Sequence, residues 1–402
     1  MNLLYICTYQ FVIKNGIPYT IPAYGNAFWD QFLESFDSVN VLGEPLRDSK
    51  NTLTVPISNK KIKVTIISAN ARPFDMVHDI EVKRHLEFAI KSSECVMIKI
   101  ASRKANMAIN IAKKYHKPYL IGVTGDLYRD LITSKSLMRR LYAPFIYKQT
   151  LKAISDCKFG TYVTQEYLQK MYPIDGVMCG YTDTILPNID PSIEKRRIDW
   201  IKSMKNRRYI DLGIIGTYHD NRKGYDTAIT ALQKLNNSKI RLRILGVGSK
   251  EDQKFWINYG QEYNVNVIFD EPVSGIENVF KWIDSIDISI LPSRSEGLPR
   301  SIVESISRAC PCIISDVCGM PELVDKKWLH DPEDSELLSS LISRMINNPT
   351  LMVEAAISNL KRADNYTLKT VRGKRIAFYA EFKEYVTLIK NEKNSHFKWN
   401  FV

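Results

Sequence analysis

Two glutamates, a glycine and the start of a helix carry the chemistry that stands out in this sequence. An apolar, alternating run over residues 286–291 predicts a short buried strand, which Pro292 ends because proline cannot donate to a strand ladder. A polar loop then carries Glu296 and Gly297, and Glu304 follows eight positions after Glu296. Carboxylates accept hydrogen bonds from neighbouring hydroxyls, and free N–H groups at a helix start bind phosphate. The pattern favours a site for a sugar, a ribose and a diphosphate.

The predicted strand, loop and helix also indicate where such a site lies. The helix is predicted to begin near Pro299, with Ser301 as its capping residue. In open α/β sheets ligands bind beside the carboxyl ends of the strands, which is where this loop begins. The alternative is a pair of solvated acids near a helix start, where acidic residues are common.

The stretch SEGLPRSIVE, which contains both glutamates, resembles the E-x7-E signature of retaining, nucleotide-sugar-dependent glycosyltransferases of family 4. Residues 309–324, ACPCIISDVCGMPELV, are similar to that family's A-x-G-x-P-V-I-A-S-x-x-G-G-x-P-E-L-V stretch. The resemblance implies an α/β fold of the GT-B type, in which two Rossmann-like doubly wound domains face a central cleft. It also implies an enzyme that transfers a hexose from a nucleotide-sugar to an acceptor hydroxyl, with retention at the anomeric carbon.

The same resemblance implies roles for four residues of the motif. Glu296 is expected to hold hydroxyls of the transferred sugar and to act in catalysis. The backbone amides of Gly297 and Leu298 are expected to hold sugar or phosphate. Glu304 is expected to accept hydrogen bonds from the ribose.

Residues 216–224, GTYHDNRKG, resemble the family's G-R-x-x-x-x-K-G element, whose cations neutralise the donor diphosphate. Lys223 matches the lysine and is expected to stabilise the leaving diphosphate as it gains charge. Thr217 stands where the family has arginine. Either Arg222 or another cation compensates, or Thr217 hydrogen-bonds the phosphate.

Three weaker matches complete the expected site. Pro272 and Val273 follow a predicted strand at 265–269 and match the loop against which relatives place the nucleobase. Gly16 matches the glycine loop facing the donor phosphates, with an ordinary turn as the alternative. At the position where many relatives carry a histidine this chain has Gly125, followed by Asp126. Asp126 either orients or deprotonates an acceptor hydroxyl, or caps the following helix.

Neither a metal nor a cofactor is expected. The seven cysteines lie mostly in apolar surroundings, as small core residues in a reducing compartment do. Cys310, Cys312 and Cys318 lack a histidine or fourth cysteine at zinc spacing, and the chain has no D-x-D pair. The G-x-G at 246–248 lacks the third glycine of a dinucleotide site. The nucleotide-sugar, expected to be UDP- or GDP-linked, is a substrate.

The charge of the chain is uneven. Of a net charge of +12 over 402 residues, the window 91–158 contributes +10, from fourteen Lys/Arg against four Asp/Glu. Such a surface attracts anionic lipid, nucleic acid or a diphosphate-bearing acceptor, or consists of solvated helix faces. No nucleic-acid-binding motif is present, so nucleic acid is not an expected partner. Within the window, residues 136–154 predict a basic helix bent at Pro144, which either lies on an anionic membrane or packs conventionally.

Four parts of the chain are predicted. Residues 1–190 alternate strands and helices and form an amino-terminal Rossmann-like acceptor domain. A linker follows at 191–208, a donor-nucleotide domain at 209–370, and a final helix at 371–402 that returns to the first domain. The expected protein acts in surface polysaccharide synthesis on a glycan or polyprenyl-diphosphate-linked acceptor, in the cytoplasm or at the inner face of the membrane. The alternative is a catalytically silent nucleotide-sugar-binding subunit, because positions 125 and 217 depart from the family pattern.

Overall fold

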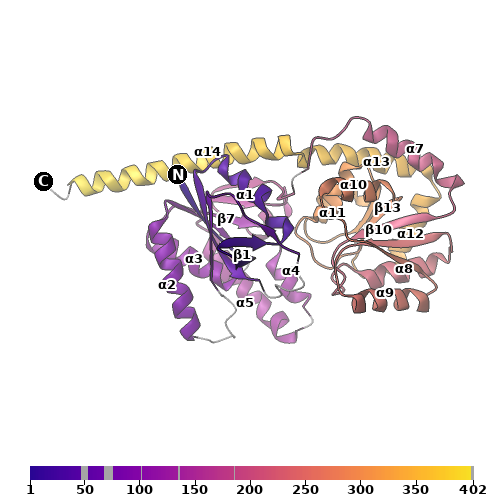
Figure 1. Cartoon of the computed structure of the whole chain (residues 1–402), viewed down its shortest axis with the longest axis horizontal. Helices are drawn as coiled ribbons and strands as arrows, with labels where there is room; N and C mark the ends of the chain where they lie inside the picture. The colour runs from indigo at the N-terminus through magenta and orange to yellow at the C-terminus, as the bar shows by residue number, and fades with distance from the viewer. Residues whose placement is uncertain (47–52, 68–75, 101, 135, 185, 400–402) are drawn as a thin grey trace. The chain divides into compact units, whose positions relative to one another are not determined.

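A computed structural model describes residues 1–46, 53–67, 76–100, 102–134, 136–184 and 186–399 (Figure 1). The chain divides into two compact units. Unit 1 contains Met1–Tyr128, Leu141–Asp183 and Arg372–Val402, and unit 2 contains Arg129–Arg140 and Thr184–Val371. Both units are Rossmann-like α/β structures, so the predicted fold class is confirmed.

Unit 1 is built on a nine-stranded sheet, counted over the described residues. Its parallel part has the order β5-β3-β1-β6-β7-β8-β9. β2 pairs antiparallel with the far end of β1, and β4 pairs antiparallel with β2. The strands are β1 (Asn2–Lys14), β2 (Ile17–Thr20), β3 (Ser38–Pro45), β4 (Val55–Pro56), β5 (Ile62–Ile66), β6 (Cys95–Lys99), β7 (Tyr119–Val123), β8 (Phe159–Tyr162) and β9 (Val177–Gly180). Its helices are α1 (Asn26–Leu33), α2 (Met76–Ser92), α3 (Arg103–Lys114), α5 (Leu137–Ile154) and α6 (Tyr167–Met171), with α5 beginning in unit 2.

The amino-terminal strand ends in a hairpin. The sequence predicted a donor-facing glycine loop or an ordinary turn at Gly16; in the structure β1 continues to Lys14 and turns back into β2. The turn consists of Asn15 and Gly16, both with positive φ, and Lys14 pairs with Ile17 across it. Asn-Gly is the preferred sequence for this two-residue hairpin, because both residues tolerate positive φ. In this structure Gly16 is therefore a hairpin residue.

The last helix, α14 (Leu368–Trp399), begins in unit 2 and continues in unit 1 (Figure 1). In unit 1 its side chains Phe378, Tyr379, Phe382 and Val386 belong to the main hydrophobic core. They pack with aromatic residues of β1, α1 and β8, including Phe159. The carboxyl-terminal helix is thus part of the core of unit 1.

Phe382→Ala is expected to lower the free energy of unfolding of unit 1 by about 3–5 kcal/mol, because the side chain is fully buried and leaves a cavity. Denaturant unfolding of the full chain measures this. Leu388→Ala, on an exposed position of the same helix, is the matched control and is expected to change stability by under about 0.5 kcal/mol. Equal losses in the two variants would show that α14 does not stabilise unit 1 through its buried face.

Unit 2 has a six-stranded parallel sheet, again within the described residues, in the order β12-β11-β10-β13-β14-β15. The strands are β10 (Ile210–Ile215), β11 (Ile240–Leu245), β12 (Asn266–Asp270), β13 (Ile288–Leu291), β14 (Cys312–Ser315) and β15 (Leu329–His330). The helices are α7 (Ile193–Ser203), α8 (Tyr225–Leu235), α9 (Lys250–Glu262), α10 (Ile276–Asp284), α11 (Arg300–Ser307), α12 (Ser335–Ile346) and α13 (Pro349–Ala363), and the short α4 (Leu127–Ile132) spans the boundary of the units. The segment predicted as a linker at 191–208 contains α7, which lies in unit 2 and packs against α13.

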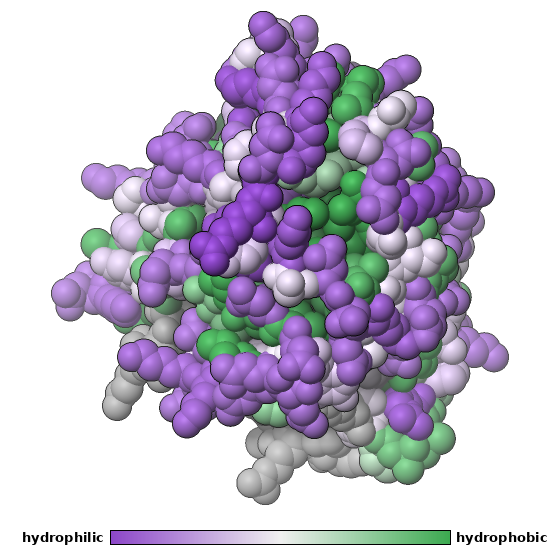
Figure 2. All heavy atoms as spheres, turned by 90° about the vertical axis from the view of Figure 1, so that its right-hand side faces the viewer, coloured by the Kyte–Doolittle hydropathy of each residue, from purple (hydrophilic) through white to green (hydrophobic). Residues whose placement is uncertain are grey.

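The surface shown in Figure 2 is mainly hydrophilic, with smaller hydrophobic areas between the polar side chains. Across the part of the chain that the structure describes, no helix is both long and apolar enough to cross a membrane. The seven cysteines are free thiols; six are buried and Cys179 is partly buried, as the sequence predicted for core residues. Burial raises the pKa of the Cys310 thiol to about 11, which makes it a poor nucleophile at neutral pH.

Candidate functional site

The site predicted from the two glutamates is built from β13, the loop after it and α11 of unit 2. All four residues of β13 are buried between β10 and β14, which fixes the start of the loop in the middle of the sheet. The loop ends at Pro299, which precedes α11. Ser301 lies inside the helix and no side chain caps its start, so the predicted capping role of Ser301 is wrong. The loop leaves the carboxyl end of the central strand, the usual place for a ligand site in such sheets.

The segment carrying Lys223 is held against this loop by a glycine. Gly224 has φ +75°, and a Cβ on it would lie 2.0 Å from the carbonyl oxygen of Pro292. Only glycine allows both this left-handed backbone and this close approach. The contact places Lys223, the residue before it, beside the loop of Glu296.

Gly224→Ala is expected to lower the free energy of unfolding by about 3 kcal/mol or more, because left-handed strain of about 1–2 kcal/mol adds to the clash with Pro292. Gly16→Ala is the control, since Gly16 has φ +77° and open space around its Cα. Gly16→Ala is expected to lower the free energy of unfolding only by the left-handed strain of about 1–2 kcal/mol. Thermal unfolding with and without a nucleotide-sugar checks both, and a Gly16 variant that loses donor binding would contradict the assignment of Gly16 as a hairpin residue alone.

Lys223 and Glu296 form a buried ion pair. The Lys223 Nζ donates to Glu296 Oε1 at 2.6 Å, and both side chains are about nine-tenths buried. The Ser293 hydroxyl lies 2.8 Å from the same carboxylate oxygen. The structure thus brings together Lys223 and Glu296, for which catalytic roles were predicted. Their charges neutralise one another.

Glu304 lies in α11 and has a different environment. No hydrogen bond or ion pair to its carboxylate is found among the described residues. Burial raises its pKa to about 7, and the charge of Arg300 opposes this shift. A partly buried carboxylate without a protein partner is costly to ionise, so a hydroxyl-bearing ligand would satisfy it.

Two further cations border the Lys223–Glu296 pair. The Arg222 guanidinium lies 3.4 Å from the Ser295 carbonyl oxygen. Arg294, which the sequence did not single out, donates to both carboxylate oxygens of Asp226, to Glu333 and to the Asn221 carbonyl oxygen. Arg294 therefore joins the loop after β13 to the first turn of α8.

An open cavity of about 960 Å³ in unit 2 has Arg222 and Arg294 in its wall. Lys223, Glu296 and Glu304 do not line it. The cavity thus adjoins the predicted site on its arginine side.

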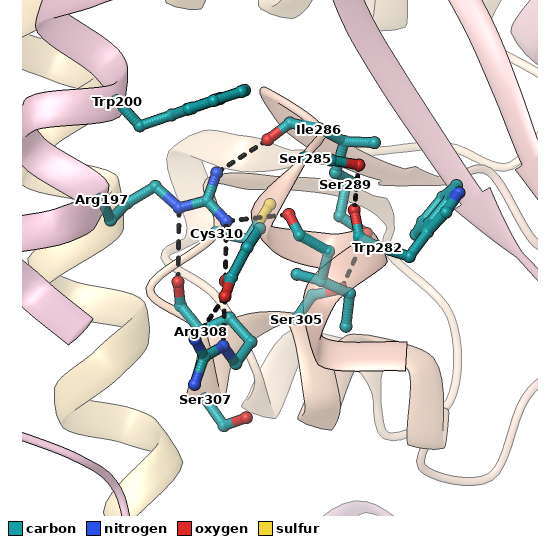
Figure 3. A network of polar contacts seen from close by, with 12 residues as sticks. Arg197, Trp200, Trp282, Ser285, Ile286, Ser289, Ser305, Ser307, Arg308 and Cys310 are labelled. Carbon is teal, nitrogen blue, oxygen red and sulfur yellow. Dashed lines mark hydrogen bonds and ion pairs between the residues drawn. The ribbon is translucent and has the colours of Figure 1, made fainter. Parts of the chain in front are cut away.

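Arg197 of α7 holds the backbone around β13 and α11 in place (Figure 3). Its guanidinium is buried and donates to the carbonyl oxygens of Ile286 at 2.7 Å, Ile283 at 2.9 Å and Arg308 at 3.3 Å. These carbonyls belong to the ends of α10 and α11 and to the entry of β13. Arg197 thereby fixes the ends of the strand–loop–helix segment, a role the sequence did not reveal because the acceptors are backbone atoms.

The remaining donor-side residues lie on loops of unit 2. Pro272 and Val273 are exposed after β12, so both are accessible to a ligand. Leu298 is buried, and the carbonyl oxygen of Gly297 accepts from the Gly319 amide. Thr217 is partly exposed after β10, and its carbonyl oxygen accepts from the Tyr225 hydroxyl.

Asp126 lies in unit 1 and is almost fully buried. Its two carboxylate oxygens accept hydrogen bonds from the Tyr172 hydroxyl at 2.8 Å and the Tyr167 hydroxyl at 2.6 Å. These bonds join Asp126, just before α4, to Tyr167 of α6 and to Tyr172, which follows α6. An ionised carboxylate has about four acceptor positions, so two such bonds are compatible with a contact to an acceptor hydroxyl.

Comparisons with known proteins show which sequences this chain resembles. Residues 210–348 match the family described as glycosyl transferases group 1. The chain is 26% identical over 391 residues to the protein CapJ of Staphylococcus aureus, covering 96% of this chain and 97% of CapJ. It is 28% identical over 137 residues to the amylovoran biosynthesis glycosyltransferase AmsK of Erwinia amylovora, covering 31% of this chain and 33% of AmsK.

The fold is shared with solved glycosyltransferase structures. HepE of Anabaena, solved with UDP and glucose, superposes with a TM-score of 0.63 at 14% identity, covering 94% of this chain and 99% of HepE. At this identity the likeness concerns the fold alone. The chain therefore has a GT-B fold, and its residues 210–348 are similar to the glycosyl transferases group 1 family.

Proposed function

We propose that this protein is a retaining glycosyltransferase that moves a hexose from a nucleotide-sugar to a hydroxyl of a glycan or polyprenyl-diphosphate-linked acceptor in polysaccharide synthesis. The observation that carries the proposal is the arrangement after β13. There a lysine–glutamate pair and a second carboxylate, which has no partner among the described residues, follow the carboxyl end of a central parallel strand. One cation and two hydroxyl acceptors match the diphosphate, sugar and ribose of a nucleotide-sugar.

The proposed chemistry assigns one role to each group. The bond between the anomeric carbon and the diphosphate oxygen breaks, and the leaving diphosphate gains negative charge, which Lys223 neutralises. Glu296 then exchanges part of its contact with Lys223 for hydroxyls of the transferred sugar. Glu304 accepts from the ribose hydroxyls. The acceptor oxygen forms the new bond to the anomeric carbon, and the leaving phosphate oxygen helps to remove the acceptor proton.

Around these groups, further contacts with the donor are proposed. Arg222 takes the place of the arginine missing at Thr217, supported by its position beside the loop of Glu296. The amides of Gly297 and Leu298 contact sugar or phosphate, and the exposed Pro272 and Val273 contact the base. No metal is required in this scheme, since cationic side chains neutralise the phosphates.

The names of the relatives support the biological setting. AmsK is named as a glycosyltransferase of amylovoran biosynthesis, and CapJ matches this chain over nearly its whole length. HepE was solved with UDP and glucose, which supports a UDP-sugar as the first donor to test. We also propose that the enzyme is cytoplasmic and acts on a lipid-linked acceptor at the inner face of the membrane.

Thermal unfolding with a panel of UDP-, GDP-, ADP- and dTDP-sugars tests the proposal, followed by assay of donor hydrolysis. A donor at a hundred times its Kd is expected to stabilise the folded state by about 2.7 kcal/mol, because it binds only that state. Slow hydrolysis with an unchanged anomeric configuration in the product supports a retaining transferase. Binding without turnover with any acceptor would favour a silent donor-binding subunit, and no binding would refute the site.

A further inference from the structure

Helix α5 exposes an unusual number of large apolar side chains. Leu137, Met138, Leu141, Tyr142 and Phe145 are each more than half exposed, with Met138 at 76% and Leu141 at 69%. Tyr142 and Phe145 contact one another, with ring centroids 5.1 Å apart, rather than entering a core. Exposed apolar groups in such a cluster mark an interaction surface.

These side chains lie on one side of the helix. At about 100° per residue the five apolar positions fall within an arc of roughly 140°. Lys148 and Lys152, both exposed, fall within the same arc, one and two turns further along. We call this set the α5 stripe; its members are Leu137, Met138, Leu141, Tyr142, Phe145, Lys148 and Lys152. Arg139 and Arg140 point elsewhere and line the cavity of unit 2.

The charge of the α5 stripe is positive and indicates which kind of partner it binds. No Asp or Glu occurs between Leu137 and Ile154, and no ion pair to Lys148 or Lys152 is found within the described residues. A second copy would present the same basic helix, with no acidic group between Leu137 and Ile154 to offset its charge, which disfavours it as the partner. The complementary surface is therefore anionic and accepts apolar side chains.

We propose that the α5 stripe docks on an anionic lipid bilayer. Leu141, Phe145 and their apolar neighbours enter the boundary between headgroups and acyl chains, as the apolar face of an interfacial helix does. The lysines, whose long stems cover apolar surface, bring their ammonium groups to the phosphates of anionic lipids. The proposal goes beyond the transfer reaction and its test needs no turnover.

Co-sedimentation of the full chain with vesicles tests it. The chain is expected to bind phosphatidylglycerol-containing vesicles, and phosphatidylcholine vesicles much more weakly, with binding reduced by high salt. The double variant Leu141→Glu/Phe145→Glu is expected to reduce binding to the anionic vesicles by roughly tenfold or more, because it replaces insertion by charge repulsion. Lys148→Gln/Lys152→Gln is expected to abolish the preference for anionic over neutral vesicles.

Phe255→Glu is the matched control. Phe255 is an aromatic residue of α9 with a similar exposed fraction and lies outside the stripe, so its variant is expected to bind vesicles like the wild type. Thermal unfolding of each variant and its stabilisation by donor confirm that the fold and the donor site are intact, which separates a failure here from a failure of the proposed function. The proposal is overturned if the wild-type protein does not bind anionic vesicles. It is also overturned if Leu141→Glu/Phe145→Glu binds them as the wild type does. A dimer that the double Glu variant dissociates, without vesicle binding, would assign the stripe to a second copy instead.

Discussion

Lys223→Met is expected to lower kcat/KM for sugar transfer by about 10²–10³-fold, the usual cost of removing one group that stabilises developing charge. The substitution keeps most of the apolar stem and removes the ammonium that would neutralise the leaving diphosphate. Glu296→Gln is expected to reduce kcat/KM as well, because an amide accepts sugar hydroxyls less strongly than a carboxylate. Steady-state kinetics on the donor identified by the panel measure both. A Lys223→Met variant within about threefold of wild type would remove Lys223 from the proposed chemistry.

Variants of the Lys223–Glu296 pair are also expected to differ in stability, which distinguishes an effect on folding from an effect on catalysis. Removing one partner leaves a charge buried, so Lys223→Met is expected to lower the free energy of unfolding by about 3–5 kcal/mol. The double variant Lys223→Met/Glu296→Gln leaves no unpaired charge and is expected to recover most of that loss, while remaining inactive. Denaturant unfolding and kinetics on the three variants make the comparison.

Lys170→Met is the control for this cycle. Lys170 pairs with Glu166 in α6 at a similar distance, but both side chains are largely exposed, so the loss is expected to stay below about 1 kcal/mol. If the double variant is no more stable than Lys223→Met, the destabilisation comes from lost packing around Lys223 rather than from the unpaired carboxylate of Glu296.

Much of unit 2 could be predicted because local signals agree with the tertiary structure. Helix α8 has strong local signals, because Gly224 stands directly before it and its apolar residues repeat with helical spacing. The strand before the two glutamates was also predicted, although β13 starts at Ile288 rather than residue 286. The secondary structure of α8 and β13 is set mainly by the local sequence rather than by contacts with distant residues.

Other features depend on contacts that no local pattern encodes. Arg197 looked like one charge of a polar linker, yet it is buried because three backbone carbonyls of distant elements accept from it. Asp126 was predicted to act on an acceptor hydroxyl or to cap a helix, and the hydrogen bonds that it accepts from Tyr167 and Tyr172, far along the chain, had no local signal. The β1–β2 hairpin did have a local signal, Asn15-Gly16 between alternating segments, which the resemblance to a glycine loop obscured.

The free energy of unfolding is expected to depend on pH through Glu304. Its pKa is about 7 in the folded protein and near 4.5 when unfolded, so the folded state binds more protons between these values. Its contribution to stability is therefore present below about pH 4.5 and is lost as pH rises to about 7. Glu304→Gln, which cannot ionise, is expected to be more stable than wild type at pH 8 by about 1–3 kcal/mol and to lose this part of the pH dependence.

Donor binding is expected to depend on the same group in the opposite direction. An ionised carboxylate accepts ribose hydroxyls more strongly than a protonated one, so the donor favours ionised Glu304. If the donor binds only that form, its Kd is about tenfold higher at pH 6 than at pH 8, because about one molecule in ten is then competent. Calorimetric titration of wild type and Glu304→Gln across this range measures the slope. A flat Kd in wild type, or an unchanged slope in Glu304→Gln, would show that Glu304 does not hold the ribose.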